Sequence, residues 1–327
     1  MSRKKLIAGI KLCLLIVVLA LVGWNVYAAW RDVGIAQLRT AVEIDWRWSA
    51  LSLLGFACVI LTSASVWFWL LRRLDPAGSP LRLYGAYCFS HMGKYVPGKV
   101  MLLLMRLERA ERLGVAHLAT TLSTIMENAA YMVSGAAVGI VVLLHFMVRR
   151  NPAGHLWLLL VAFCSIVVLL FAIHPGVFYR LTNQVLNWMG RPVIEPGRRL
   201  PMSSVMVSTV MMVPCWFFGG VALWATTRCL VPVGFDHFWV LMSAYALSVL
   251  LGIISFLPGG LGVRELVQGY LLLPVVSASI PATQAIEAEA TIIVAMVVML
   301  QRLFQITTET GLGLLGGALT SRKLHKC

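Results

Sequence analysis

The chain has 327 residues, of which 60% are hydrophobic and 12% are charged, and its formal net charge is +14. A soluble domain is about 45 to 50% apolar and about 25% charged, so this composition excludes a water-soluble fold. It predicts an all-α, polytopic membrane protein. Lys and Arg gather at the ends of apolar runs, as the positive-inside bias requires, which favours the membrane bilayer and its anionic lipids over nucleic acid as partners.

Apolar runs predict about seven to nine transmembrane helices in a single domain, residues 1–327. The first span, about 6–28, follows a basic start and is too long for a signal peptide, which predicts a cytoplasmic N-terminus. Residues 30–48 have balanced charge, as expected of an external loop. The second span, about 48–71, returns to the basic residues Arg72, Arg73 and Arg82.

Residues 101–112 predict a helix with arginines at 106, 109 and 112 and a stop at Gly114, interpreted as an interfacial helix with a solvated face. Further spans are expected at about 116–147, 156–172, 205–227 and 238–257. The loop 174–201 is rich in arginine and is expected in the cytoplasm. Residues 281–320 form either one long helix or two short spans.

Two interruptions break apolar runs in a similar way. Pro97-Gly98 and Pro258-Gly259 lie 161 residues apart, and each precedes a long segment with an intramembrane charge, Glu127 or Arg302. This arrangement indicates two related halves, about 81–147 and 238–318, in parallel or inverted orientation. Paired halves with broken hydrophobic segments are the sequence feature that points to a transporter binding site.

The second interruption, Phe256-Leu-Pro-Gly-Gly-Leu-Gly-Val-Arg-Glu265, resembles the hallmark of the lysylphosphatidylglycerol synthase transmembrane-region family, whose members are described as flippase-like. Other stretches fit the same pattern, and together the resemblance covers nearly the whole chain: Lys94-Tyr-Val-Pro-Gly-Lys99, Glu127, Trp216-Phe-Phe-Gly-Gly220 and Gln301-Arg-Leu-Phe-Gln-Ile-Thr-Thr-Glu309. The resemblance implies lipid handling in a bacterial inner membrane, with a phospholipid, glycolipid or polyprenyl-phosphate lipid as substrate and envelope-biosynthesis enzymes as further partners. The chain lacks the soluble aminoacyl-transfer domain of bifunctional members, so lysyl transfer is not expected. Lys99 stands where many relatives have another residue.

The candidate lipid-binding residues lie at the two breaks and in the spans after them: Lys94, Pro97, Gly98, Lys99, Glu127, Pro258, Gly259, Gly260, Arg264, Glu265, Arg302 and Glu309. The basic groups are expected to hold a lipid phosphate, helped by a helix N-terminus at the second break, while the carboxylates hold the basic groups in place. An ionisable group within a span is expensive and usually faces a cavity or a partner. Two other interpretations stay open: Lys94 and Lys99 snorkel to the interface, or Glu127 clamps the halves by pairing with Arg302 or Arg264.

The expected function is that of a flippase-like protein, not an enzyme, which moves or binds a phosphate-bearing lipid or lipid-linked saccharide for envelope or polysaccharide assembly. The seven cysteines and seven histidines show no metal-ligand spacing, and no Walker loop or hydrolase motif occurs, so neither cofactor nor metal is expected. One alternative is a non-transporting membrane subunit of a glycosyltransferase or polysaccharide complex. The other is an intramembrane lipid transferase.

Overall fold

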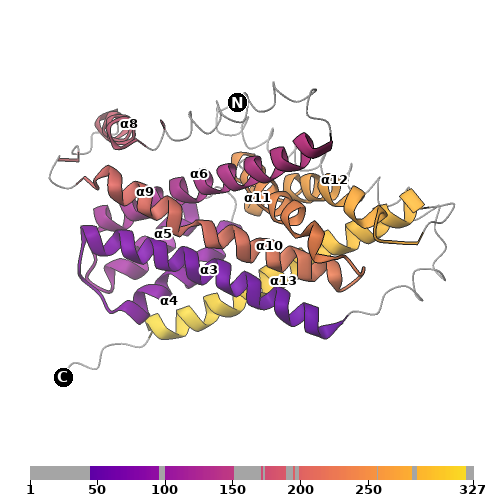
Figure 1. Cartoon of the computed structure of the whole chain (residues 1–327). Helices are drawn as coiled ribbons and strands as arrows, with labels where there is room; N and C mark the ends of the chain where they lie inside the picture. The colour runs from indigo at the N-terminus through magenta and orange to yellow at the C-terminus, as the bar shows by residue number, and fades with distance from the viewer. Residues whose placement is uncertain are drawn as a thin grey trace, which may run out of the picture. The chain divides into compact units, whose positions relative to one another are not determined.

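The computed structural model describes residues 45–95, 100–150, 171, 174–188, 194–195, 199–255, 257–281 and 286–321. Every regular element within these ranges is a helix, which confirms the all-α fold (Figure 1). The predicted span at 6–28, nearly all of the span at 156–172, and the residues Pro97, Gly98 and Lys99 lie outside the described residues.

Within the described residues, four helical segments are long and apolar enough to cross a membrane, so the chain is a membrane protein. They are α3 (Trp46–Leu74), the pair α9 (Met202–Met211) and α10 (Val213–Arg228), the segment Phe235–Ile254, and Ala288–Ser321. The third consists of η3 (Phe235–His237) and α11 (Phe238–Ile254), and the fourth is most of α13 (Ile286–Ser321). They coincide with predicted spans, whereas the total of seven to nine stays a prediction. The last region is therefore one continuous helix rather than two short spans.

The described residues form two compact units. Unit 1 contains residues 45–57, 94–95, 217–255, 257–281 and 286–309, and unit 2 contains 58–93, 100–150, 174–188, 194–195, 199–216 and 310–321. Each unit is assembled from segments far apart in the sequence. The two sequence-related halves, 81–147 and 238–318, stay a prediction.

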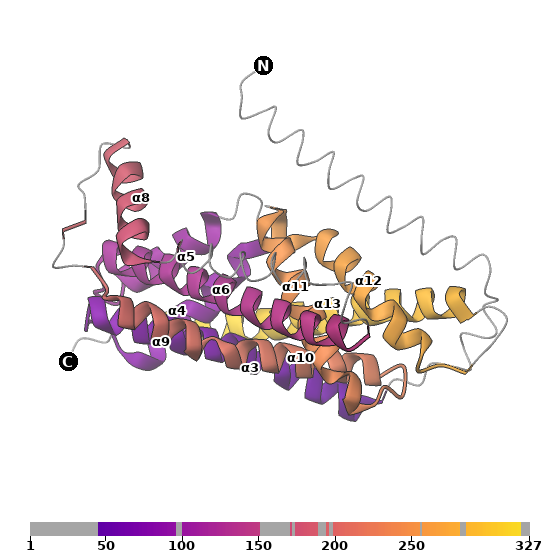
Figure 2. The same ribbon diagram turned by 45° about the horizontal axis from the view of Figure 1, so that its top comes forward.

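In unit 1, α11 lies beside α12 (Val263–Ser277), as Figure 2 shows. Small residues allow α10 to approach α11 closely. A Cβ on Gly219 would lie 2.0 Å from a ring carbon of Tyr245, and one on Gly220 would lie 2.7 Å from the Cβ of Met242. The glycines of the Trp216-Phe-Phe-Gly-Gly220 stretch therefore have a packing role, of the kind small residues have between membrane helices.

Unit 2 contains α4 (Pro80–His91), α5 (Val100–Glu111) and α6 (His117–Arg150), and α6 lies beside α9 (Figure 2). Its core is formed by apolar side chains from these helices and from the second half of α3, including Trp67, Leu70, Leu83 and Leu122. Two polar side chains of this unit, Trp216 and Tyr179, have partners nearby. Trp216 donates from Nε1 to Ser134 Oγ at 2.8 Å, and α8 (Pro175–Trp188) holds the following loop through a bond from Leu200 N–H to the Tyr179 hydroxyl at 2.8 Å.

Candidate functional site

The second break is a glycine turn between two helices. Gly259, Gly260 and Gly262 have φ values of 60°, 71° and 82° and flank or belong to η4 (Pro258–Gly260). Residues with a Cβ rarely adopt this left-handed region, so the Pro-Gly-Gly-Leu-Gly pattern is a conformational requirement. The turn ends α11 and starts α12 at Val263, which puts Arg264 and Glu265 in the first turn of a helix, as the sequence predicts.

Arg264 is packed into the turn by its aliphatic stem. A Cβ on Gly252 would lie 2.5 Å from Arg264 Cγ, and one on Gly260 would lie 2.9 Å from its Cδ. The guanidinium carbon is 5.8 Å from the ring centre of Tyr245. Arg264 is 5% exposed, and its Nε and Nη2 atoms are buried with no hydrogen-bond partner within the described parts of the chain. The protein thus fixes this side chain without satisfying its donors.

Two other basic side chains of unit 1, Arg302 and Lys94, are held by carboxylates. Arg302 of α13 pairs through Nε with Glu265 and donates from Nη2 to the carbonyl of Gly259 at 3.1 Å. Lys94 of η1 (Met92–Tyr95) pairs with Glu309 of α13. The sequence-predicted residues Lys94, Gly259, Arg264, Glu265, Arg302 and Glu309 therefore lie in one cluster, with Gly260 in the turn beside Arg264.

Lys94 is bound within this cluster rather than snorkelling alone. Its side chain is 22% exposed, and the paired Glu309 side chain is 3% exposed. Tyr95 donates its hydroxyl to the other oxygen of Glu309 at 2.6 Å, and Gln305 donates to Oε1 at 2.8 Å. Glu309 thereby connects the segment before the first break to α13.

The balance of the cluster is positive. Lys94, Arg264 and Arg302 lie within electrostatic range of one another, and two of the three have a carboxylate partner, Glu309 or Glu265. Three basic groups against two acidic groups leave a surplus of one positive charge among these five described residues. Because a buried charge is costly without a counter-charge, the arrangement suits an anionic ligand.

One face of α13 carries a buried polar stripe beside this cluster. Its members recur at helical spacing and are all 8% exposed or less: Gln301, Arg302, Gln305 and Glu309. The opposite face is apolar and exposed, with Met299 at 61%, Leu303 at 58% and Ile306 at 40%. Polar residues inside and apolar residues outside are what a membrane span with a polar interior requires. The stripe spans nine residues, from Gln301 to Glu309, which corresponds to a helix rise of about 12 Å.

Several amides near the cluster are also unsatisfied. Both polar atoms of Gln268 and of Gln301 are buried without a hydrogen-bond partner in the described ranges, as is Oε1 of Gln305. Gln268 follows Arg264 by four residues and shares its buried face of α12. An unmade buried hydrogen bond costs about 1 to 3 kcal/mol, so these groups favour a ligand with donors and acceptors.

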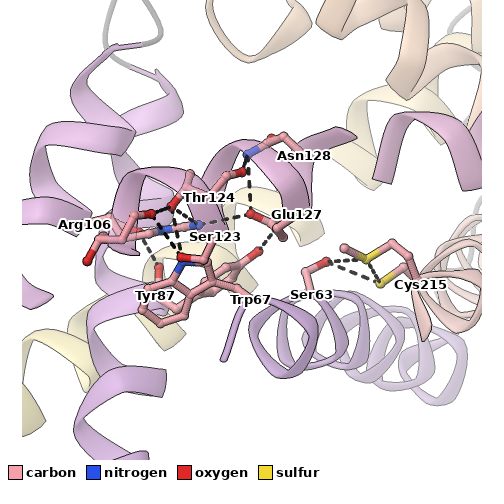
Figure 3. Close-up of polar contacts among 12 residues, drawn as sticks. Ser63, Trp67, Tyr87, Arg106, Ser123, Thr124, Glu127, Asn128 and Cys215 are labelled. Carbon is pink, nitrogen blue, oxygen red and sulfur yellow. Dashed lines mark hydrogen bonds and ion pairs between the residues drawn. The ribbon is translucent and has the colours of Figure 1, made fainter. Parts of the chain in front are cut away.

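A second polar network lies in unit 2 around Glu127 of α6 (Figure 3). Tyr87 donates its hydroxyl to Glu127 Oε1 at 3.0 Å, and Arg106 donates from Nη1 to Oε2 at 3.1 Å. Asn128 approaches the same oxygen at 3.4 Å. Each oxygen of Glu127 therefore has a partner, and together these partners come from three helices, α4, α5 and α6.

Arg106 is enclosed on several sides. It is 1% exposed, donates from Nε to Ser90 Oγ at 3.0 Å, and lies 4.0 Å from the ring centre of Tyr87 and 5.2 Å from that of Trp67. The interpretation of residues 101–112 as a helix with one solvated arginine face is wrong at this position. It is right at Arg112, which is exposed and pairs with Glu108. The two arginines are six residues apart and so project about 120° apart on the helix.

Glu127 has a different partner from the one expected. One interpretation left open by the sequence was a clamp with Arg302 or Arg264, whereas the structure pairs Glu127 with Arg106 inside unit 2. The breaks and intramembrane charges could be found in the sequence. The contributions of Tyr87, Tyr95, Arg106 and Gln305 were not predicted. Tyr95 and Gln305 lie within the quoted motifs and Arg106 in the predicted helix 101–112, but nothing in the sequence indicates their partners.

The described residues contain no group of three or more His, Cys, Asp or Glu side chains that could hold a metal ion. Comparison with family models and with curated proteins finds no match to this chain.

Proposed function

We propose that this chain is a flippase-like protein of a bacterial inner membrane that binds a phosphate-bearing lipid or a lipid-linked saccharide and moves its head group across the bilayer for envelope or polysaccharide assembly. The observation that carries the proposal is Arg264, a buried guanidinium with unsatisfied donors in a cluster with a surplus positive charge. The resemblance to the lysylphosphatidylglycerol synthase transmembrane-region family supports lipid as the substrate class.

In this mechanism the phosphate bonds to Arg264, because a guanidinium can offer two parallel N–H groups to two phosphate oxygens. Lys94 and Arg302 add positive charge, while Glu309 and Glu265 orient them. The amides of Gln268, Gln301 and Gln305 bond to hydroxyl or carbonyl groups of the head group. The lipid tail stays in the bilayer, beside apolar faces such as that of Leu303 on α13.

The test is translocation of a fluorescent polyprenyl-phosphate lipid in liposomes that contain the purified full chain. Arg264→Met keeps much of the stem that packs on Gly252 and Gly260 but removes the donors, and we expect it to slow translocation about tenfold or more, the loss of at least one charge-assisted bond. Arg47→Met is the matched control, because Arg47 is exposed at the start of α3, and its rate should equal the wild-type rate. Equal rates for wild type and Arg264→Met would overturn the proposed mechanism.

A second candidate is the non-transporting membrane subunit, and one observation favours it. Glu127 and Arg106 are fully buried and fully paired, as expected of an interior that is closed rather than a path. The same liposome assay separates the candidates. A wild-type chain that binds phosphate lipids but leaves their distribution at the protein-free rate would support the subunit, and translocation that depends on Arg264 would exclude it.

A further inference from the structure

Unit 2 contains a pocket whose lining shares no residue with the proposed lipid path. Its volume is about 510 Å³, within the usual range for ligand pockets. The lining combines two arginines, Arg73 and Arg199, with apolar side chains that include Leu118 and Leu122. A lining that is cationic in part and otherwise apolar matches an anionic amphiphile.

Both arginines are held in place by local contacts. Arg73 donates from Nη1 to Ser204 Oγ at 3.1 Å and lies 4.2 Å from the ring centre of Trp69. Arg199 donates from Nη2 to the Ile194 carbonyl at 3.2 Å and lies 5.6 Å from the ring centre of Tyr179. A guanidinium has five N–H donors, so these bonds leave donors on each for a ligand.

No carboxylate within the described residues forms an ion pair with Arg73 or Arg199, so their charges are not neutralised by the protein there. The acidic residue next to the pocket is Asp75. Its two oxygens accept the backbone N–H groups of Ala77 and Ala116, both at 2.8 Å. The pocket therefore has a net positive lining that a phosphate would complement.

The pocket also lies at the ends of two candidate membrane spans. Arg73 is in the last turn of the apolar helix α3, and Pro201 directly precedes α9, the start of another candidate span. The two segments that meet here, around residues 72–82 and 174–201, are both expected in the cytoplasm from their charge. The cytoplasmic leaflet carries anionic lipid, which attracts basic residues near the membrane surface.

We propose that this pocket binds an anionic phospholipid of the cytoplasmic leaflet, with its phosphate on Arg73 and Arg199 and the start of an acyl chain along Leu118 and Leu122. The site is separate from the cluster around Arg264 and does not depend on the proposed translocation.

Native mass spectrometry of the purified full chain, titrated with phosphatidic acid, tests the proposal. We expect wild type to bind phosphatidic acid at least about tenfold more tightly than Arg73→Gln/Arg199→Gln, because charge-assisted bonds to the phosphate are lost. Phosphatidylcholine and inorganic phosphate should bind wild type no better than the variant. Arg47→Gln/Arg112→Gln removes two exposed arginines elsewhere and should bind phosphatidic acid as wild type does.

A further variant keeps both arginines and changes the apolar part. Leu118→Trp should fill the pocket and weaken phosphatidic acid binding, which covers the case in which the double arginine variant fails to fold. Three results would each overturn the proposal: unchanged binding in Arg73→Gln/Arg199→Gln, an equal loss in Arg47→Gln/Arg112→Gln, or inorganic phosphate binding as tightly as the lipid. The last would assign the pocket to free phosphate.

Discussion

Single residues decide how each unit accommodates charge inside an apolar bundle. In unit 2, Arg106 is matched by a carboxylate, a hydroxyl and two aromatic rings, and Glu127 has a partner for each oxygen. In unit 1, Arg264 has a similar degree of burial but unsatisfied donors. A satisfied pair contributes to a stable interior, whereas an unsatisfied buried group is costly and persists where a ligand completes it.

Removing one member of the satisfied pair should be more harmful than removing both. Arg106→Leu leaves Glu127 charged and buried, which costs about 3 to 5 kcal/mol, whereas Arg106→Leu/Glu127→Leu leaves no uncompensated charge and should recover most of that loss. Thermal unfolding of the purified protein in detergent, followed by tryptophan fluorescence, measures both effects. Arg112→Leu is the control, because its ion pair with Glu108 is exposed and should contribute about 1 kcal/mol or less. A double variant less stable than the single variant contradicts this account.

The sequence indicates which residues carry unusual charge but not which of them meet. Glu127 is the one acidic residue in a long apolar segment, so its importance could be predicted. Its partner Arg106 lies in the helix 101–112, which the sequence predicts to have a solvated face. Lys94 and Glu309 are 215 residues apart, and no local pattern links them. Which charged residues form ion pairs depends on tertiary packing. The sequence therefore predicts the charged residues themselves but not the Arg106–Glu127 pair.

At the scale of helices, glycines set how closely elements approach. In unit 2 the last part of α13 packs on α4. A Cβ on Gly316 would lie 2.4 Å from the carbonyl oxygen of Gly85, and one on Gly313 would lie 2.8 Å from Met92 Cγ. Arg109 of α5 donates to Thr320 of α13 at 2.8 Å. Close backbone approach of this kind is how membrane helices associate without a hydrophobic driving force between them.

Gly316→Ala should therefore separate α13 from α4 and destabilise unit 2 by about 1 to 3 kcal/mol, the usual cost of overpacking. The neighbouring atom is backbone, so it cannot move aside as a flexible side chain would. Gly311→Ala on the same helix is the matched control, because nothing lies within 4 Å of its Cβ position. The midpoint of thermal unfolding in detergent should fall for the first variant and stay or rise for the second. Equal midpoints would show that the Gly85 contact is unimportant.

The sequence predicted where membrane helices are present better than it predicted whether a long apolar region is one continuous helix. The apolar runs at 48–71, 205–227 and 238–257 correspond to α3, to α9 with α10, and to η3 with α11. They could be predicted because length and hydropathy suffice to identify a membrane span. The region 281–320 left two choices, and the structure has one helix there. Arg302 does not break it, since Glu265 and the Gly259 carbonyl satisfy the side chain. That compensation comes from other segments and is invisible in the local sequence.

At the scale of the whole molecule, the central expectation is a fixed orientation in the membrane. α3 has 29 residues, about 44 Å of helix, which exceeds the roughly 30 Å hydrocarbon core. Its first turn carries Arg47 and its last turn Arg72 and Arg73. The sequence 30–48 has balanced charge, whereas 72–82 and 174–201 are basic, so the C-terminal end of α3 is expected in the cytoplasm.

Cysteine accessibility tests this orientation. In a variant with the native cysteines replaced, Arg47→Cys should react with a membrane-impermeant thiol reagent added outside intact cells, while Ser79→Cys and Glu195→Cys should react only after the cells are opened. All three positions are exposed at the protein surface, so a failure to react reports the membrane and not burial. Ala64→Cys, fully buried in the middle of α3, is the control and should not react on either side. Labelling of both Ser79→Cys and Glu195→Cys from outside would show that the orientation is the opposite one. Labelling of only one of them would contradict the pocket, because Arg73 and Arg199 line it together on one side of unit 2.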